Sequence, residues 1–64
     1  MHIGDVVQYV ADGMTHGRMT VEAVFPSLNT EKELVLCVWF SEVHADYVRR
    51  LFRTIDLIRI GHRP

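Results

Sequence analysis

The sequence predicts a single all-β domain, a small antiparallel barrel of about five strands that spans residues 1–64. Three observations predict this fold class. The chain has only 64 residues, 48% of them hydrophobic and 23% charged, which suits one globular domain and excludes large α/β architectures. Its apolar segments are short and rich in β-branched residues. Loops of about six residues separate these segments, as in small barrels whose closure removes exposed sheet edges.

The first two strands are expected at residues 5–11 and 18–25. The first is rich in β-branched residues, which favour extended structure. In the second, polar and apolar residues alternate, so every other side chain is expected to face the core. The residues expected on this inner face are Met19, Val21, Ala23 and Phe25. Residues 12–17 contain two glycines and are expected to form a loop, and Pro26 is expected to end the second strand.

The third strand is expected at residues 33–40, the most apolar stretch of the chain. Its two faces carry Val35, Cys37 and Trp39 on one side and Leu36, Val38 and Phe40 on the other. A strand that is apolar on both faces is usually covered twice. In so short a chain, the second cover is either the far wall of a closed barrel or another subunit. The second of these alternatives predicts a homodimer formed through the third strand.

Residues 42–53 fit two descriptions. Val43, Tyr47, Leu51 and Ile55 recur every four residues, which is a helical stripe and leads to an alternative α+β fold. As a strand, residues 47–53 would place Val48, Arg50 and Phe52 on one face. The pattern alone leaves helix and strand open. A short last strand is expected at residues 55–60, ended by Gly61.

Several of these segments together resemble the YodC-like family of small bacterial proteins, which has no established activity. The matching segments are Gly4-Asp5-Val6-Val7-Gln8, Met19-Thr20-Val21-Glu22, Cys37-Val38-Trp39-Phe40, and Phe52 followed by Leu57. The resemblance runs from Gly4 to about Leu57. It implies an SH3-like β-barrel, which favours a strand at residues 47–53, and it implies no catalytic residue.

Two segments depart from the family pattern. The first loop is longer here and lacks the proline of the family's Gly-Gly-Pro loop, so the geometry of its tip is not carried over. The stretch between Phe40 and Phe52 is rich in arginine and apolar residues, where the family is polar and contains glycine. A different surface at this place predicts a different partner.

The net charge of −1 is unlike that of most nucleic-acid-binding domains, but the charge is unevenly distributed. Residues 1–46 are acidic overall. The segment from Tyr47 to the C-terminus has Asp56 as its only acid, and its basic residues are Arg49, Arg50, Arg53, Arg59 and Arg63. These arginines are expected either to pair with the acidic part of the chain or to form a basic edge that meets an anionic partner.

Cysteine content and hydropathy favour a cytoplasmic protein without a membrane segment. Cys37 is the only cysteine, so it forms no internal disulfide and supplies no structural zinc site, which fits a reducing compartment. The N-terminal residues lack the basic start and apolar stretch of a signal peptide. No apolar run approaches the roughly 20 residues that span a bilayer.

No motif for catalysis or for a cofactor is present. The four histidines, at positions 2, 16, 44 and 62, are not spaced as local metal-ligand pairs, and we expect them to be exposed in loops. Cys37 is expected to be a buried core residue and not a nucleophile. Gly13 and Gly17 are not followed by the Lys-Ser/Thr pair of a phosphate-binding loop. We therefore expect neither an enzyme nor a cofactor or metal.

The sequence thus predicts a binding module that meets a protein partner. The candidate partner-binding residues are Tyr47, Arg49, Arg50 and Arg53, together with Met14 and His16 in the first loop. Tyrosines on a small barrel can form a groove that receives an extended peptide. As an alternative function, aromatic residues interleaved with arginines could stack on single-stranded nucleic acid.

Overall fold

A computed structural model of the chain describes residues 1–11, 14–15 and 17–63, and this part of the chain is all-β. It holds six strands and two short 3₁₀ turns, and no α-helix. Their bounds are β1 (Asp5–Ala11), β2 (Met14–Thr15), β3 (Met19–Phe25), η1 (Thr30–Lys32), β4 (Leu34–Ser41), β5 (Asp46–Arg53), η2 (Thr54–Asp56) and β6 (Leu57–His62). The predicted fold class is therefore confirmed.

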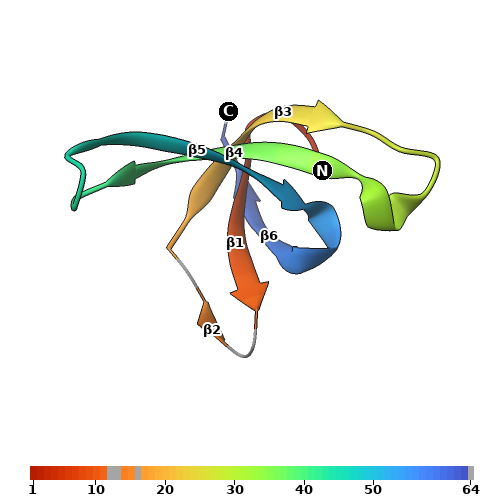
Figure 1. The fold of residues 1–64 in the computed structure, drawn as a ribbon, viewed down its shortest axis with the longest axis horizontal. Coiled ribbons are helices and arrows are strands. Elements are labelled where there is room, and N and C mark those ends of the chain that lie inside the picture. Colours follow the sequence, from red (N-terminus) through yellow and green to blue (C-terminus); the bar gives the residue numbers. More distant parts are fainter. Residues whose placement is uncertain (12–13, 16, 64) are drawn as a thin grey trace.

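The strands form one antiparallel sheet in the order β2-β1-β3-β4-β5. The last strand, β6, pairs with the edge of β1 that lies opposite β3. The sheet is strongly bent, so that β1 and β6 cross behind the long β4–β5 hairpin (Figure 1). Within the described ranges, β5 pairs with β4 alone and η2 links it to β6 without a ladder between them. The barrel expected from the sequence is thus left open along β5.

The core lies inside this bend and receives side chains from four of the strands. Its buried apolar residues are Val7, Met19, Val21, Val35, Cys37 and Leu57. Tyr9, Trp39 and Phe52 are half-buried and pack against this cluster. Because only six apolar side chains are buried in the described residues, each contributes a large share of the stability of so small a domain.

A β-bulge in β3 changes which of its side chains point into the core. The register of β3 against β4 shifts between Val21 and Ala23, so Val24 and not Ala23 lies beside Val35 on the inner face. One extra residue in a strand moves every later side chain to the opposite face. Phe25 is consequently half-exposed and not in the core as expected.

The helix alternative for residues 42–53 is wrong. β5 pairs with β4 in register from Asp46 opposite Ser41 to Arg53 opposite Leu34. This ladder satisfies the backbone groups on one side of β4, which a helix at the same place would leave without partners. Long-range pairing therefore overrides the four-residue apolar spacing of this segment.

Two further boundaries differ from the expectation. The two-residue strand β2 pairs with the end of β1 inside the segment expected to be a loop. The last strand begins at Leu57, after η2, and continues through Gly61 to His62. Gly61 lies opposite Val6 in the ladder, so it continues the strand that it was expected to end.

None of the helical segments in the described residues is long and apolar enough to cross a membrane.

Candidate functional site: an aromatic groove beside β5

A groove of about 470 Å³ lies between β4 and β5 on one side and β1 and the start of β3 on the other. Its lining residues are Tyr9, Gly17, Arg18, Met19, Trp39, Phe40, Arg50 and Phe52. A smaller hollow of about 300 Å³ shares Tyr9, Arg50 and Phe52 with the groove and extends toward η2. Together they form one elongated depression, which we call the β5 groove.

Aromatic side chains form the floor of the β5 groove. The ring centroid of Phe52 lies 5.2 Å from that of Tyr9 and 6.3 Å from that of Trp39, with tilted planes in both pairs. These are favourable aromatic contact distances, and all three residues are only partly buried. The three rings come from β1, β4 and β5, so the floor exists only in the folded sheet.

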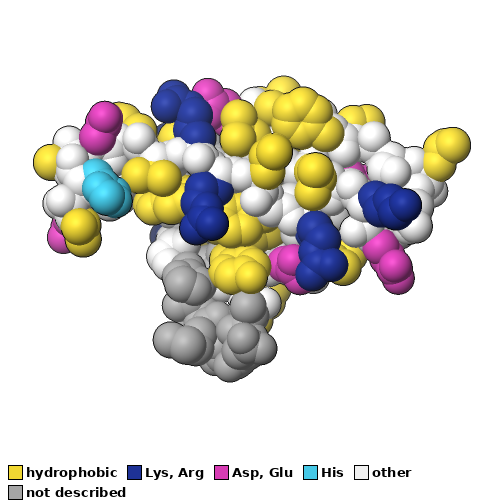
Figure 2. All heavy atoms as spheres, in the orientation of Figure 1, with side chains coloured by type: hydrophobic (Ala, Val, Ile, Leu, Met, Phe, Trp, Pro, Cys, Tyr) yellow, Lys and Arg dark blue, Asp and Glu magenta, His cyan; other side chains and the backbone are white. Residues whose placement is uncertain are grey.

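Arginines line the rim of the β5 groove. Arg18 and Arg50 are exposed, and neither forms an ion pair with a residue in the described part of the chain. Arg53, in the smaller hollow, contacts Asp56 with 3.0 Å between its Nε and the carboxylate Oδ2. The face drawn in Figure 2 shows basic side chains interleaved with apolar ones over β4 and β5. The rim thus carries two guanidinium groups that can meet an anion.

The structure divides the predicted partner-binding residues between the two faces of β5. Arg50 faces the groove, opposite Cys37 in the ladder. Arg49 and Tyr47 face the other way, because successive side chains of a strand alternate. His16 and the side chain of Met14 lie outside the described residues. Sequence reasoning placed Arg50 and Phe52 on one face of the expected strand, but it did not predict that Arg18 and Tyr9 are their neighbours, since nothing local links these segments.

The opposite side of the β3–β4–β5 sheet, here called the outer face, is an apolar surface. Its residues are Phe25, Leu36, Val38, Phe40, Tyr47 and Leu51. Tyr47 is 62% and Leu51 55% exposed, and the rings of Phe40 and Tyr47 meet edge to face at 5.4 Å. The Arg49 Nε atom lies 2.9 Å from Glu22 Oε2 on the same surface, so this pair adds no net charge.

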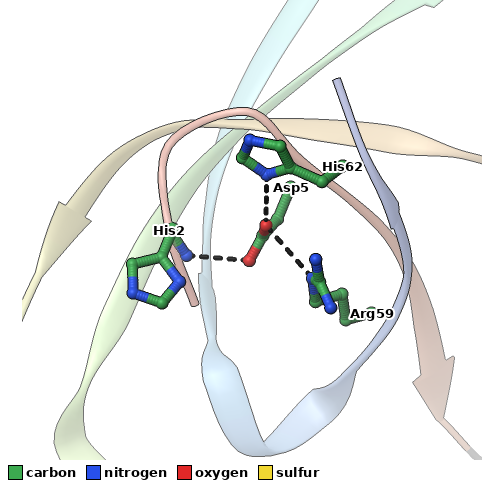
Figure 3. Close-up of polar contacts among 4 residues, drawn as sticks. All are labelled: His2, Asp5, Arg59 and His62. Atoms are coloured by element: carbon green, nitrogen blue, oxygen red, sulfur yellow. Dashed lines mark hydrogen bonds and ion pairs between the residues drawn. The ribbon is translucent and has the colours of Figure 1, made fainter. Parts of the chain in front are cut away.

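A buried carboxylate, Asp5, links the two ends of the chain (Figure 3). Asp5 is 1% exposed and accepts three hydrogen bonds. The backbone N–H of His2 donates to Oδ2 at 2.8 Å, while Arg59 Nε and His62 Nδ1 contact Oδ1 at 3.2 and 2.8 Å. Since an ionised carboxylate only accepts, His62 must donate its hydrogen from Nδ1.

The same contacts explain the electrostatics of Asp5. The hydrogen bond from His62, and next that from the His2 backbone, hold the pKa of the Asp5 carboxyl well below its ordinary value of 3.8, although burial opposes them. Gly4 permits the tight turn before Asp5, because its φ of +93° is strained for other residues. Neither hollow of the β5 groove includes Asp5 or His62, so we interpret the cluster as a structural link.

The described histidines and Cys37 do not line the β5 groove. His62 is exposed as expected, but it lies at the end of β6 and contacts Asp5, which corrects the expectation that every histidine lies in a loop. Burial raises the pKa of the Cys37 thiol to about 11, so the thiol is protonated at neutral pH and unreactive. Among the described residues, no group of three or more His, Cys, Asp or Glu side chains could hold a metal ion.

Comparison of the chain with protein-family models, curated proteins and solved structures finds no match. The resemblance to the YodC-like family therefore stays a prediction from the sequence motifs. The geometry of the β5 groove and of the outer face carries the functional argument.

Proposed function

We propose that the protein is a non-enzymatic binding module whose β5 groove receives an extended segment of a protein partner. The observation that carries this proposal is the combination of an aromatic floor with two arginines that lack an ion-pair partner in the described residues. Partly exposed aromatic rings gain apolar contacts when a peptide covers them. A groove between strands accommodates an extended chain, which is narrower than a helix. The single buried Cys37 fits a cytoplasmic location for this module.

The groove favours a peptide over an enzyme substrate because nothing in it supplies chemistry. Its described side chains are apolar, aromatic or arginine except for Asp56, whose carboxylate is held by Arg53, and the groove places no nucleophile beside a general base. Such a lining can bind and orient a ligand by packing and charge. We infer that recognition is the activity of this site.

Replacing Arg50 with alanine is expected to weaken peptide binding by about tenfold, because it removes an unpaired charge from the groove rim. The experiment selects ligands for the wild-type protein from a displayed library of random peptides and measures their affinity by the fluorescence of Trp39, the only tryptophan. Lys32→Ala removes the same charge outside the groove and is the matched control. Recovery of no peptide, or equal binding by the two variants, would contradict the proposed site.

Single-stranded nucleic acid is the other class of ligand that arginines and aromatic rings can bind. The acidic partners of Arg49 and Arg53 reduce the positive charge near the groove, and the chain as a whole is negative. A protein ligand is therefore favoured. Titration of Trp39 fluorescence with a thymidine oligonucleotide at low salt tests the alternative, and steeply salt-dependent binding there would replace the peptide proposal.

The outer face supports a second proposal, self-association through β4. Phe25, Phe40, Tyr47 and Leu51 are at least half-exposed on one contiguous surface, which is the kind of apolar patch that subunit interfaces cover. The neutral Glu22–Arg49 pair creates no repulsion between two copies of this surface. The homodimer predicted from the sequence of the third strand would use this face.

Val38→Glu is expected to convert such a dimer into a soluble monomer, because it would bury an excess negative charge beside the Glu22–Arg49 pair in the interface. Sedimentation equilibrium measures the change in mass. Leu28→Glu introduces the same charge at a fully exposed position away from the outer face and should leave the mass unchanged. A wild type that is already monomeric at high protein concentration would rule out self-association.

A further inference from the structure

The free edge of β5 is the feature that carries the inference. β5 has eight residues, and within the described ranges its backbone pairs with β4 on one side only. Every second residue of an edge strand directs its N–H and C=O away from the sheet. An extended peptide that lies along such an edge can form the same ladder that joins the strands of the sheet.

The β5 groove runs along this strand, since its smaller hollow is lined by the consecutive residues 50–53 of β5. Arg50 and Phe52 line the groove from β5, and Tyr9 and Arg18 line it from the opposite side. A peptide strand paired with β5 would therefore lie over the groove. Since side chains alternate along a strand, every second side chain of the peptide would enter the groove and contact Phe52 and the rim arginines.

Charge indicates which kind of strand fits. The β5 sequence includes Arg49, Arg50 and Arg53, and Arg50 and Arg18 have no carboxylate partner in the described part of the chain. If two copies of β5 paired antiparallel about their midpoints, Arg49 of each copy would lie opposite Arg50 of the other. Like charges on directly opposed residues destabilise such pairing, whereas acidic side chains would pair with them.

We propose that the partner segment is an acidic peptide that adds to the free edge of β5 as a further strand, with alternate side chains in the β5 groove. This inference rests on the proposed function and names the partner's chemistry and its mode of binding. Two requirements follow from it. The peptide must carry acidic side chains toward Arg50 and Arg18, and it must present free backbone N–H groups to β5 at every second residue.

The test uses eight-residue peptides, the length of β5, in which glutamate and valine alternate and both ends are blocked. Two further peptides are N-methylated, one at every glutamate and the other at every valine. Only one of these two sets of N–H groups can face β5. We expect one N-methylated peptide to bind at least about tenfold more weakly than the parent and the other to bind like the parent. Trp39 fluorescence reports affinity.

The preference for an acidic peptide and the position of its binding site are tested with the same Trp39 fluorescence. A peptide of alternating lysine and valine should not bind, and Arg50→Ala and Arg18→Ala should each weaken the acidic peptide while Lys32→Ala does not. Slower amide exchange confined to alternate residues of β5 in the complex would support the ladder independently of any variant. These outcomes together identify β5 as the edge that accepts the strand.

The results that overturn the inference differ from those that overturn the proposed function. Equal affinity of all three acidic peptides would exclude strand addition and leave groove binding intact. Failure of the acidic peptides, with basic or neutral peptides recovered from the random library, would exclude the acidic class. Recovery of no peptide from that library would overturn the proposed function itself.

Discussion

Replacing Asp5 with alanine is expected to cause the largest loss of stability of any single polar substitution in the described part of the chain. The Asp5 carboxylate accepts hydrogen bonds from the His2 backbone, Arg59 and His62 while it is 1% exposed. Its removal leaves the His2 N–H without this acceptor and deletes the side-chain link between the N-terminal turn and β6. The urea midpoint, followed by circular dichroism, should fall strongly.

The matched control is Asp46→Ala, at the exposed start of β5, where the stability change should stay within about 0.5 kcal/mol. Asp5→Asn keeps the volume of the side chain but presents an amide where the three donors need acceptors, so it should also be destabilised. An Asp5→Ala protein as stable as the wild type would show that the cluster contributes nothing to folding.

The free energy of unfolding should depend on pH in the way that the lowered pKa of Asp5 predicts. Because its pKa is lowered on folding, the stability it contributes is complete above the ordinary pKa of 3.8 and is lost as the pH falls below it toward the folded-state pKa. The difference in urea midpoint between wild type and Asp5→Ala should therefore shrink as the pH falls from about 6 to about 3. A difference that does not change across this interval would contradict the ionised state of Asp5.

Truncation of Trp39 to alanine is expected to lower the free energy of unfolding by about 3 kcal/mol, the low end of the range for aromatic residues because Trp39 is half-buried. Its ring packs against the core cluster and lies 6.3 Å from that of Phe52. A domain of 64 residues has a total stability of roughly 3–10 kcal/mol, so the variant should be close to unfolding at room temperature.

Trp39→Phe distinguishes the effect of losing an aromatic ring from the effect of a smaller ring. It keeps an aromatic side chain against Phe52 and should cost less than about 1.5 kcal/mol. Circular dichroism must follow the unfolding, since both variants remove the only tryptophan. Native stability of Trp39→Ala would mean that this ring belongs to the surface alone and serves the groove without supporting the core.

Much of the fold could be predicted from the sequence because strand formation leaves a local pattern. Apolar residues spaced by two placed Val35 and Cys37 on one face of β4, and both are fully buried. The same logic failed in β3 beyond Glu22, because the bulge there reverses the facing of Ala23 and Phe25 without a marker in the sequence. It was ambiguous at β5, where only pairing with β4 excludes the helix.

The candidate site was predicted only in part. The arginine-rich segment led to Arg50, but alternation sends Arg49 to the outer face, where it pairs with Glu22. Tyr9 and Arg18 reach the groove from distant parts of the chain. Asp5 had no sequence signal as a buried anion, since its partner His62 is 57 residues away.

The sequence by itself determined that this chain forms short strands with an apolar core and carries excess arginine near its C-terminus, because alternation, composition and turn residues act over a few neighbouring positions. Only the tertiary structure decided which edge stays open, which arginines remain without ion-pair partners in the described residues, and which carboxylate is buried. These properties depend on strand register and on contacts between distant segments. The balance of many weak long-range interactions sets them, and no local pattern records that balance.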